Sequence, residues 1–323
     1  GHGRWGALGD VLSNIYELNG YDVCREYYVN DYGTQAKTFA ECVKCLYLKN
    51  FKIESEYPQD GYPKDTVKVV SDILIERYKD AFFDHENSSI KDEKKLQEYS
   101  IKIMVDIIKD SLKSMGVEFD IWFFESSLYE DDNFNKVLKF LKEKDLIYKK
   151  EGAIWFKSSQ YDDDKDRVLI RQDGAPTYFA SDIMYVINKV DRGFKKLIYI
   201  LGADHHGYVN RLLAITKSIG QQDGYLSVLI GQLVRLVEGN ELLKMSRRKG
   251  KSYTLNDLIA EVGKDAIRYF FNMNSLDTHM DFDISLAKER SSKNPVYYVQ
   301  YAHARINSII AKAKQIDKEI VDK

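Results

Sequence analysis

A phenol and a carboxylate lie four residues apart in the segment DGAPTYFASDIMY, at Tyr178 and Asp182. Pro176 suits the first turn of a helix, so this spacing places both side chains on one helix face. Such a pair is a good receptor for a planar guanidinium, because a carboxylate can accept two parallel charge-assisted hydrogen bonds that fix its orientation. An ordinary polar helix face has the same spacing, and the residues alone leave both interpretations open.

The segment GADHHGY directly follows the apolar run LIYIL. In open α/β sheets, ligands bind in the crevice at the carboxyl ends of the strands, where this segment falls. Gly202 lets a ribose approach the backbone, and Asp204 can accept from sugar hydroxyls. His205 and His206 can donate or accept hydrogen bonds near neutral pH. We expect a nucleotide-binding wall rather than a zinc site, since the spacing matches no usual set of zinc ligands.

Five cations crowd the glycine-containing segment KMSRRKGK, ahead of a helix pattern that resumes at residue 255. Such a cluster can hold a polyphosphate and neutralise the charge that develops as pyrophosphate leaves. Charge alone would more often mark a solvated loop. The order Lys244, Met245, Ser246, Arg247 makes the phosphate-binding interpretation much the stronger.

Gly1 and His2 head the first helix pattern, where unpaired backbone N–H groups and the helix dipole favour a phosphate. A lone Gly-His dipeptide is more often an ordinary exposed histidine. Cys42 and Cys45 form a single C-x-x-C without a second pair, which favours packing or surface placement over metal binding. The acidic run YDDDKD lacks the spacing of a calcium loop and reads as a solvated loop. We therefore expect no metal site.

The elements that position these residues alternate in type. A helix ends at Asn19-Gly20, and a strand over 23–29 leads to a polar turn and a helix from Gln35. Later, the strand VLIR, a helix over 176–190, the strand LIYIL and a helix from about residue 210 follow one another, which predicts a parallel sheet with right-handed crossovers. Between about residues 51 and 160, helical segments, the strand-like FDIWFFESSLY and a probable hairpin indicate an inserted domain.

Bulk properties limit the class of protein. The 323 residues carry 48 basic and 50 acidic side chains, for a net charge of -2, which excludes the strongly basic balance of a general nucleic-acid coat. Three cysteines are too few and too odd in number for a secreted disulfide framework. The sequence has no apolar run near the ~18 residues that cross a bilayer, and it does not begin with a signal-peptide pattern. We expect a cytoplasmic protein without a membrane anchor.

Taken together, the motifs resemble one family. Gly1-His2 looks like the second half of the His-x-Gly-His signature of class I aminoacyl-tRNA synthetases, and KMSRRKG looks like their Lys-Met-Ser-Lys-Ser loop. The segments REYYVNDYGTQ, FDIWFFESSLY, DGAPTYFASDI, LGADHHGYVNRL and NPVYYVQYAHARI resemble arginyl-tRNA synthetase segments in the same order. The similarity covers nearly the whole chain.

The resemblance implies an α/β fold, with the Rossmann-type parallel sheet of class I catalytic domains split by an inserted α+β domain and followed by the start of an α-helical bundle. Residues 1–50 would form the first half of the nucleotide-binding domain, with its first strand missing, and 51–165 the connective insertion. Residues 166–265 would form the second half with the KMSRR loop. Residues 266–323 would be a linker and the start of the helical anticodon-binding domain.

The implied reaction activates arginine with ATP and transfers it to tRNA(Arg), with Mg²⁺ accompanying ATP. His2, Lys244 and Arg247 would be catalytic, through charge stabilisation and alignment rather than proton transfer. ATP would contact those three residues together with Gly1, Gly202, Asp204, His205, Met245 and Ser246. Arginine would contact Tyr178, Asp182 and His206, and the same cleft would hold Asn30, Asp31 and Gln35. A monomer is the family expectation.

Two departures from the family pattern matter. Arg247 stands where lysine is most common, which keeps the charge but spreads it over a planar group. The N-terminal domain, the first half of the signature and most of the anticodon-binding domain are not in the sequence, so we expect a fragment whose own activity is open. The alternative function is a catalytically inactive synthetase-like module that binds RNA or a protein partner. A nucleotidyltransferase would explain Gly1-His2 but not Tyr178 with Asp182.

Overall fold

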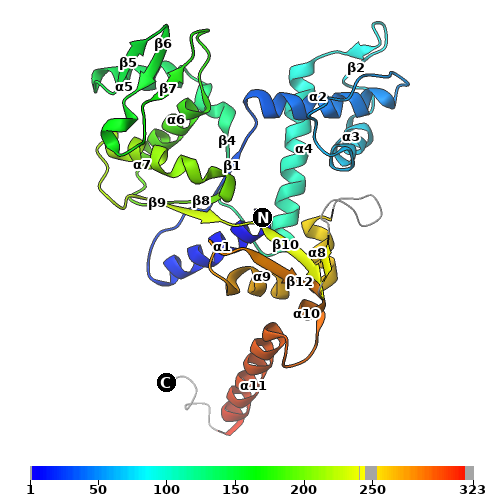
Figure 1. Ribbon diagram of the computed structural model, residues 1–323. Coiled ribbons are helices and arrows are strands. Elements are labelled where there is room, and N and C mark those ends of the chain that lie inside the picture. The colour runs from blue at the N-terminus through cyan, green and yellow to red at the C-terminus, as the bar shows by residue number, and fades with distance from the viewer. Residues whose placement is uncertain (1, 240, 244–252, 317–323) are drawn as a thin grey trace. The chain divides into compact units, whose positions relative to one another are not determined.

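The chain forms two compact units in a computed structural model that describes residues 2–239, 241–243 and 253–316 (Figure 1). The first unit comprises residues 1–11, 111–117 and 232–323, and the second comprises 12–110 and 118–231. Helices α1 (His2–Leu18) and α4 (Glu93–Ser114) contribute residues to both units. None of the described helices combines the length and the apolar character needed to cross a membrane.

Two pairs of parallel strands form the α/β part of the second unit. One pair is β1 (Glu26–Val29) with β4 (Ile121–Phe124), and the other is β8 (Leu197–Gly202) with β9 (Leu226–Gly231). Within each pair the carboxyl ends are in register, Val29 opposite Phe124 and Gly202 opposite Gly231. The residues that follow β1 and β4 therefore leave the sheet side by side. Strand β4 lies in the range 51–165 that we expect to be the insertion, yet it pairs with β1 from the range 1–50.

A separate antiparallel sheet has the order β5 (Ile147–Lys150), β6 (Ala153–Phe156) and β7 (Arg167–Ile170). The predicted hairpin is β5–β6, with Glu151 and Gly152 at positive φ in its turn. The prediction that VLIR joins a parallel sheet is wrong, because β7 pairs antiparallel with β6. Only ten residues, 157–166, connect β6 to β7, and a short connection of this kind favours antiparallel pairing, since parallel strands need a longer crossover.

Helices cover two large apolar cores in the described part of the second unit. The first core lies among α2 (Gly33–Lys49), α3 (Lys64–Tyr78), α4 and the short hairpin β2 (Phe83–Asp84) and β3 (Ser89–Ile90). Cys42 and Cys45 are buried in this region, which selects packing over surface placement, and the Cys45 Sγ lies 3.0 Å from the Glu56 carbonyl oxygen. The second core joins the antiparallel sheet and β8–β9 to α5 (Asn133–Glu143), α6 (Tyr178–Asp191) and α7 (Val209–Ser218).

The first unit is built around the three-stranded sheet β11-β10-β12, in which β10 (Val234–Glu238) is antiparallel to β11 (Glu241–Leu243) and parallel to β12 (Met280–Asp283). Phe270 and Phe271 contact Phe282 with ring centroids 5.3 and 5.7 Å apart, which packs a helix on the sheet. Four of the described helices follow α1 and α4 in this unit, and the first of them begins with a capping box formed by Thr254 and Asp257. These helices are α8 (Leu255–Val262), α9 (Lys264–Met273), α10 (Ile284–Lys288) and α11 (Pro295–Ile316).

Candidate active site

Helix α6 carries the predicted receptor residues in its first two turns. It begins at Tyr178, two residues later than predicted, because Pro176 forms a β-bridge with Ile170 and Thr177 occupies the N-cap position. Tyr178 is 48% exposed, whereas Asp182 is partly buried. Asp182 accepts no hydrogen bond from any residue in the described ranges. A carboxylate that is withdrawn from water and unpaired suits a cationic ligand.

A second carboxylate faces this position, which the sequence reasoning missed. Glu125 is the first residue after β4, in a 3₁₀ turn η1 (Glu125–Tyr129), and it is only 3% exposed. Its carboxylate forms hydrogen bonds with Tyr28 of β1 and Ser181 of α6. The Tyr129 hydroxyl also lies 2.8 Å from the Ser181 Oγ. The ends of β1 and β4 and the start of α6 thus meet around one acidic centre.

The electrostatics of this centre favour an incoming cation. Burial raises the pKa of Asp182 to about 7, and the neighbouring Glu125 carboxylate adds to the rise while Arg211 opposes it. Burial also raises the pKa of Glu125. Two carboxylates close to one arginine leave a net negative site once both are ionised. A bound cation would favour the ionised form of both groups.

The predicted cleft residues Asn30, Asp31 and Gln35 follow β1 and lie beside Glu125. Asp31 accepts hydrogen bonds from the Ser126 backbone N–H at 2.9 Å and the Ser126 hydroxyl at 2.5 Å. Asn30 Nδ2 lies 2.9 Å from Gln35 Oε1, and with its amide turned round Asn30 can donate to Glu125 Oε2 at 3.2 Å. Asp31 therefore holds the turn that carries Glu125, a role that only its contacts could reveal.

The arginine that opposes Asp182 lies at the start of α7. The Arg211 guanidinium is 4.6 Å from the centroid of the Tyr208 ring, and its buried Nε has no hydrogen-bond partner among the described residues. Arg211 and His206 line a hollow of about 400 Å³, together with Asp163, Asp164, Lys165, Arg167, Gly207, Val209 and Asn210. The structure thus places His206 beside Arg211, and among the described residues His206 makes no hydrogen bond or ion pair with Asp182.

The segment after β8 forms a 3₁₀ turn, η3 (Ala203–Tyr208). Gly202, expected directly after the strand, is its last residue and is buried, and Asp204 and His205 are exposed beyond it. The Asp204 Oδ2 lies 3.6 Å from the His205 Nε2, and the His205 ring packs 5.3 Å from the Tyr208 ring. These side chains are accessible to a ligand that approaches the end of β8.

The remaining predicted residues belong to the first unit. His2 is the first residue of α1, and its exposed ring contacts Trp5 with centroids 4.9 Å apart. Two positions further on, Arg4 is fully buried. Gly1, Lys244, Met245, Ser246 and Arg247 lie outside the described residues.

Chemically, the centre in the second unit can bind a planar cation and hold it in one orientation. The residues missed from the sequence are Tyr28, Glu125 and Arg211. Glu125 could have been predicted from the sequence, because it directly follows a strand. Asp204, which the sequence did indicate, lies two residues after one. Tyr28 and Arg211 carried none, since their roles depend on which strand and helix become neighbours.

Comparison with known proteins gives the family. The description "tRNA synthetases class I (R), catalytic domain" matches residues 1–311. Arginine–tRNA ligases of Bacillus subtilis and Carboxydothermus hydrogenoformans are 46% and 45% identical over 98% of this chain. The chain spans 56% of the length of both relatives.

Solved structures agree with this result. A Campylobacter jejuni structure assigned as an arginyl-tRNA synthetase superposes with a TM-score of 0.85 at 37% identity, over 97% of this chain and 68% of that one. The Thermus thermophilus arginyl-tRNA synthetase shares the fold, with a TM-score of 0.67 at 18% identity over 97% of this chain and 62% of its own. The chain therefore belongs to the arginine-specific class I aminoacyl-tRNA synthetases and contains their catalytic domain.

Proposed function

We propose that this chain provides the catalytic part of an arginine–tRNA ligase. A carboxylate oxygen of arginine attacks the α-phosphorus of ATP, pyrophosphate leaves, and arginyl-adenylate forms. The terminal ribose hydroxyl of tRNA(Arg) then attacks the arginyl carbonyl, and AMP leaves. The observation that carries the proposal is the unpaired Asp182, with its raised pKa, beside the buried Glu125.

Arginine selectivity follows from these two carboxylates. The guanidinium is planar and always charged, and it presents N–H donors along two edges. Asp182 and Glu125 supply acceptors for it, and the exposed phenol of Tyr178 lies one turn earlier on the same helix. Lysine has the charge but lacks the planar set of N–H donors, and citrulline has a similar planar shape but no charge.

The phosphates are assigned to other residues. We assign His2, Lys244 and Arg247 to neutralising charge on ATP and on the departing pyrophosphate, together with Gly1, Met245 and Ser246. Mg²⁺ enters with ATP as part of that substrate. Gly202, Asp204 and His205 are assigned to the ribose and base side of ATP, and His206 to the amino acid. The support is the family membership and the position of Gly202 at the end of a parallel strand.

We keep the predicted division into residues 1–50, 51–165, 166–265 and 266–323, in which the last range begins an anticodon-binding domain. The parallel pairing of β4 with β1 is the reason to expect that part of the insertion range serves the nucleotide-binding sheet. We also propose a monomeric, cytoplasmic enzyme, in keeping with three unpaired cysteines.

The test compares ligands that share a shape but differ in charge. In the presence of a non-hydrolysable ATP analogue, arginine should raise the melting temperature of the chain, while citrulline should not, because selective binding to the folded state stabilises it. Asp182→Asn and Glu125→Gln should each lose most of the arginine response. Glu130→Gln, an exposed carboxylate at the end of the same turn, is the matched control and should keep it. Equal responses to arginine and citrulline would contradict the proposal.

A further inference from the structure

The antiparallel sheet β5-β6-β7 has one face buried in a core and one face that the core does not cover. Phe156 and Leu169 point into the core, with 0% and 1% exposure. The opposite face carries a row across the three strands, because Tyr148 pairs with Trp155 and Trp155 with Val168. An indole on an uncovered sheet face is a surface on which a flat ring can stack.

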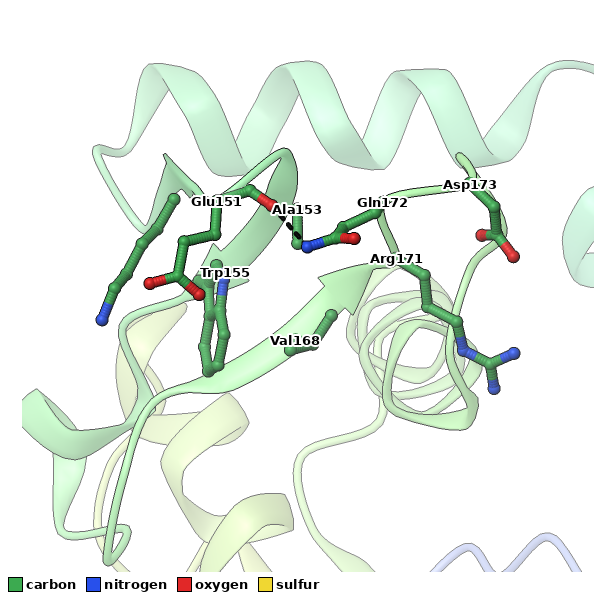
Figure 2. A pocket seen from close by; sticks show the side chains of 8 residues that line it. Glu151, Ala153, Trp155, Val168, Arg171, Gln172 and Asp173 are labelled. Carbon is green, nitrogen blue, oxygen red and sulfur yellow. Dashed lines mark hydrogen bonds between the residues drawn. The ribbon is translucent and has the colours of Figure 1, made fainter.

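A hollow of about 450 Å³ lies over this face (Figure 2). It is lined by Lys150, Glu151, Ala153, Trp155, Val168, Arg171, Gln172 and Asp173. At one end the Gln172 Nε2 donates to the Glu151 carbonyl oxygen at 2.8 Å, which ties the β5–β6 turn to the loop after β7, as the dashed line in Figure 2 shows. The volume falls within the range of small-ligand pockets and would accommodate a single nucleotide.

The polar groups around the hollow are suited to an anion joined to a ring. The Lys150 Nζ is 6.0 Å from the centroid of the Trp155 ring, and Arg171 lines the hollow from the end of the sheet. Both cations are exposed, and neither has an ion-pair partner within the described part of the chain. Two acids, Glu151 and Asp173, also line the hollow, and the Asp173 Oδ1 accepts a hydrogen bond from the Ala175 backbone N–H at 2.9 Å.

The indole ring is only partly exposed. The Trp155 Nε1 is buried and has no hydrogen-bond partner in the described structure, so a ligand in the hollow does not reach it. The hollow therefore combines a stacking surface with two cations that have no ion-pair partner among the described residues.

We propose that this hollow binds an unpaired nucleotide of the tRNA, with its base stacked on Trp155 and its phosphates held by Lys150 and Arg171. The inference rests on the proposed function for the presence of an RNA substrate. A free mononucleotide has the same chemistry, but two exposed cations on a sheet face suit the phosphates of a continuous strand. A mononucleotide site would more typically use the backbone N–H groups of a glycine-rich turn.

The experiment measures binding of a fluorescently labelled tRNA(Arg) transcript to the chain by anisotropy. Trp155→Ala should weaken binding at least about tenfold, and Trp155→Phe should retain most of it, because stacking by an aromatic ring contributes on the order of tenfold per base. The double variant Lys150→Gln with Arg171→Gln should lower the slope of log K against log salt by about two. Lys149→Gln, one residue away and on the other side of β5, is the matched control and should bind like the parent chain.

Binding of Trp155→Ala within about twofold of the parent would overturn the proposal, as would an equal loss in Lys149→Gln. Competition of AMP with the transcript in the parent chain, but not in Trp155→Ala, would show a mononucleotide site instead. The arginine-induced rise in melting temperature should persist in every variant, which shows that each one is folded. If the parent chain lacks that rise, the proposed function fails, while dependence of RNA binding on Trp155 is still measured independently.

Discussion

At the residue scale, the proposed arginine site contains a carboxylate that is unfavourably placed in the ligand-free protein. Asp182 is partly buried near another acid, and its pKa rises to about 7 because of burial and of Glu125. A free carboxyl group has a pKa of about 4. The folded protein therefore holds a proton here more tightly than the unfolded chain does between pH 4 and 7. Over that interval this group lowers the stability of the fold as pH rises.

Replacing Asp182 by Asn should accordingly weaken arginine binding while it raises the stability of the ligand-free protein. Arginine affinity should fall at least about tenfold, since a charge-assisted bond of ~1.5–3 kcal/mol is weakened. The ligand-free variant should be more stable than the parent at pH 8 by about 1–4 kcal/mol, since each pKa unit corresponds to ~1.4 kcal/mol. This gain should shrink towards pH 5, where the parent carboxyl is protonated in the fold.

Thermal unfolding at the two pH values measures the effect on stability, and titration calorimetry measures the affinity for arginine. Glu130→Gln serves again as the exposed control and should show no such difference between pH 8 and pH 5. A lower stability of Asp182→Asn at pH 8 would mean that the carboxylate is compensated in the empty protein.

At the element scale, a buried arginine fixes the start of α1 in the first unit. The Arg4 guanidinium donates to four backbone carbonyl oxygens at and beyond the end of α9. They are Phe271 at 3.3 Å, Asn274 at 3.3 Å, Ser275 at 2.7 Å and Thr278 at 2.9 Å. These carbonyls include orphan groups at a helix C-terminus, where a cation is also favoured by the dipole. Arg4 thereby fixes the backbone just after His2, the predicted phosphate ligand.

Arg4→Met should cost about 2–5 kcal/mol, because it leaves one buried and three partly buried carbonyl oxygens without this donor. Arg235→Met is the matched control within the same unit. Arg235 forms an ion pair with Asp281 at 2.6 Å, but both side chains are exposed, and pairs of this kind contribute little. Differential scanning calorimetry should show a large fall in melting temperature for Arg4→Met alone. Equal melting temperatures for the two variants would show that Arg4 does not hold the helix.

At the scale of the whole molecule, local patterns predicted the parts of the fold that depend on neighbouring residues. The helix with Tyr178 and Asp182 on one face, the β5–β6 hairpin and the glycine at the end of β8 are confirmed. Pairings between distant segments were not predictable. The partner of β1 is β4, whose paired residues lie 95 positions later in the chain, and β7 turns back on β6 instead of entering a parallel sheet.

The same distinction explains the candidate site. Asp182 was predictable because its partner Tyr178 is one helical turn away. Glu125 was missed because it approaches Asp182 only after β4 pairs with β1. Arg211 is brought close by α7, another element of the same unit. The family resemblance suggested the proposed substrate, and the contacts revealed the second carboxylate.

Arginine binding by the two carboxylates is tested most directly by a crystal structure of the chain with bound arginine. The guanidinium should lie within about 3 Å of carboxylate oxygens of both Asp182 and Glu125, as charge-assisted hydrogen bonds require. A guanidinium bound elsewhere, with Asp182 still unpaired, would contradict the proposed site.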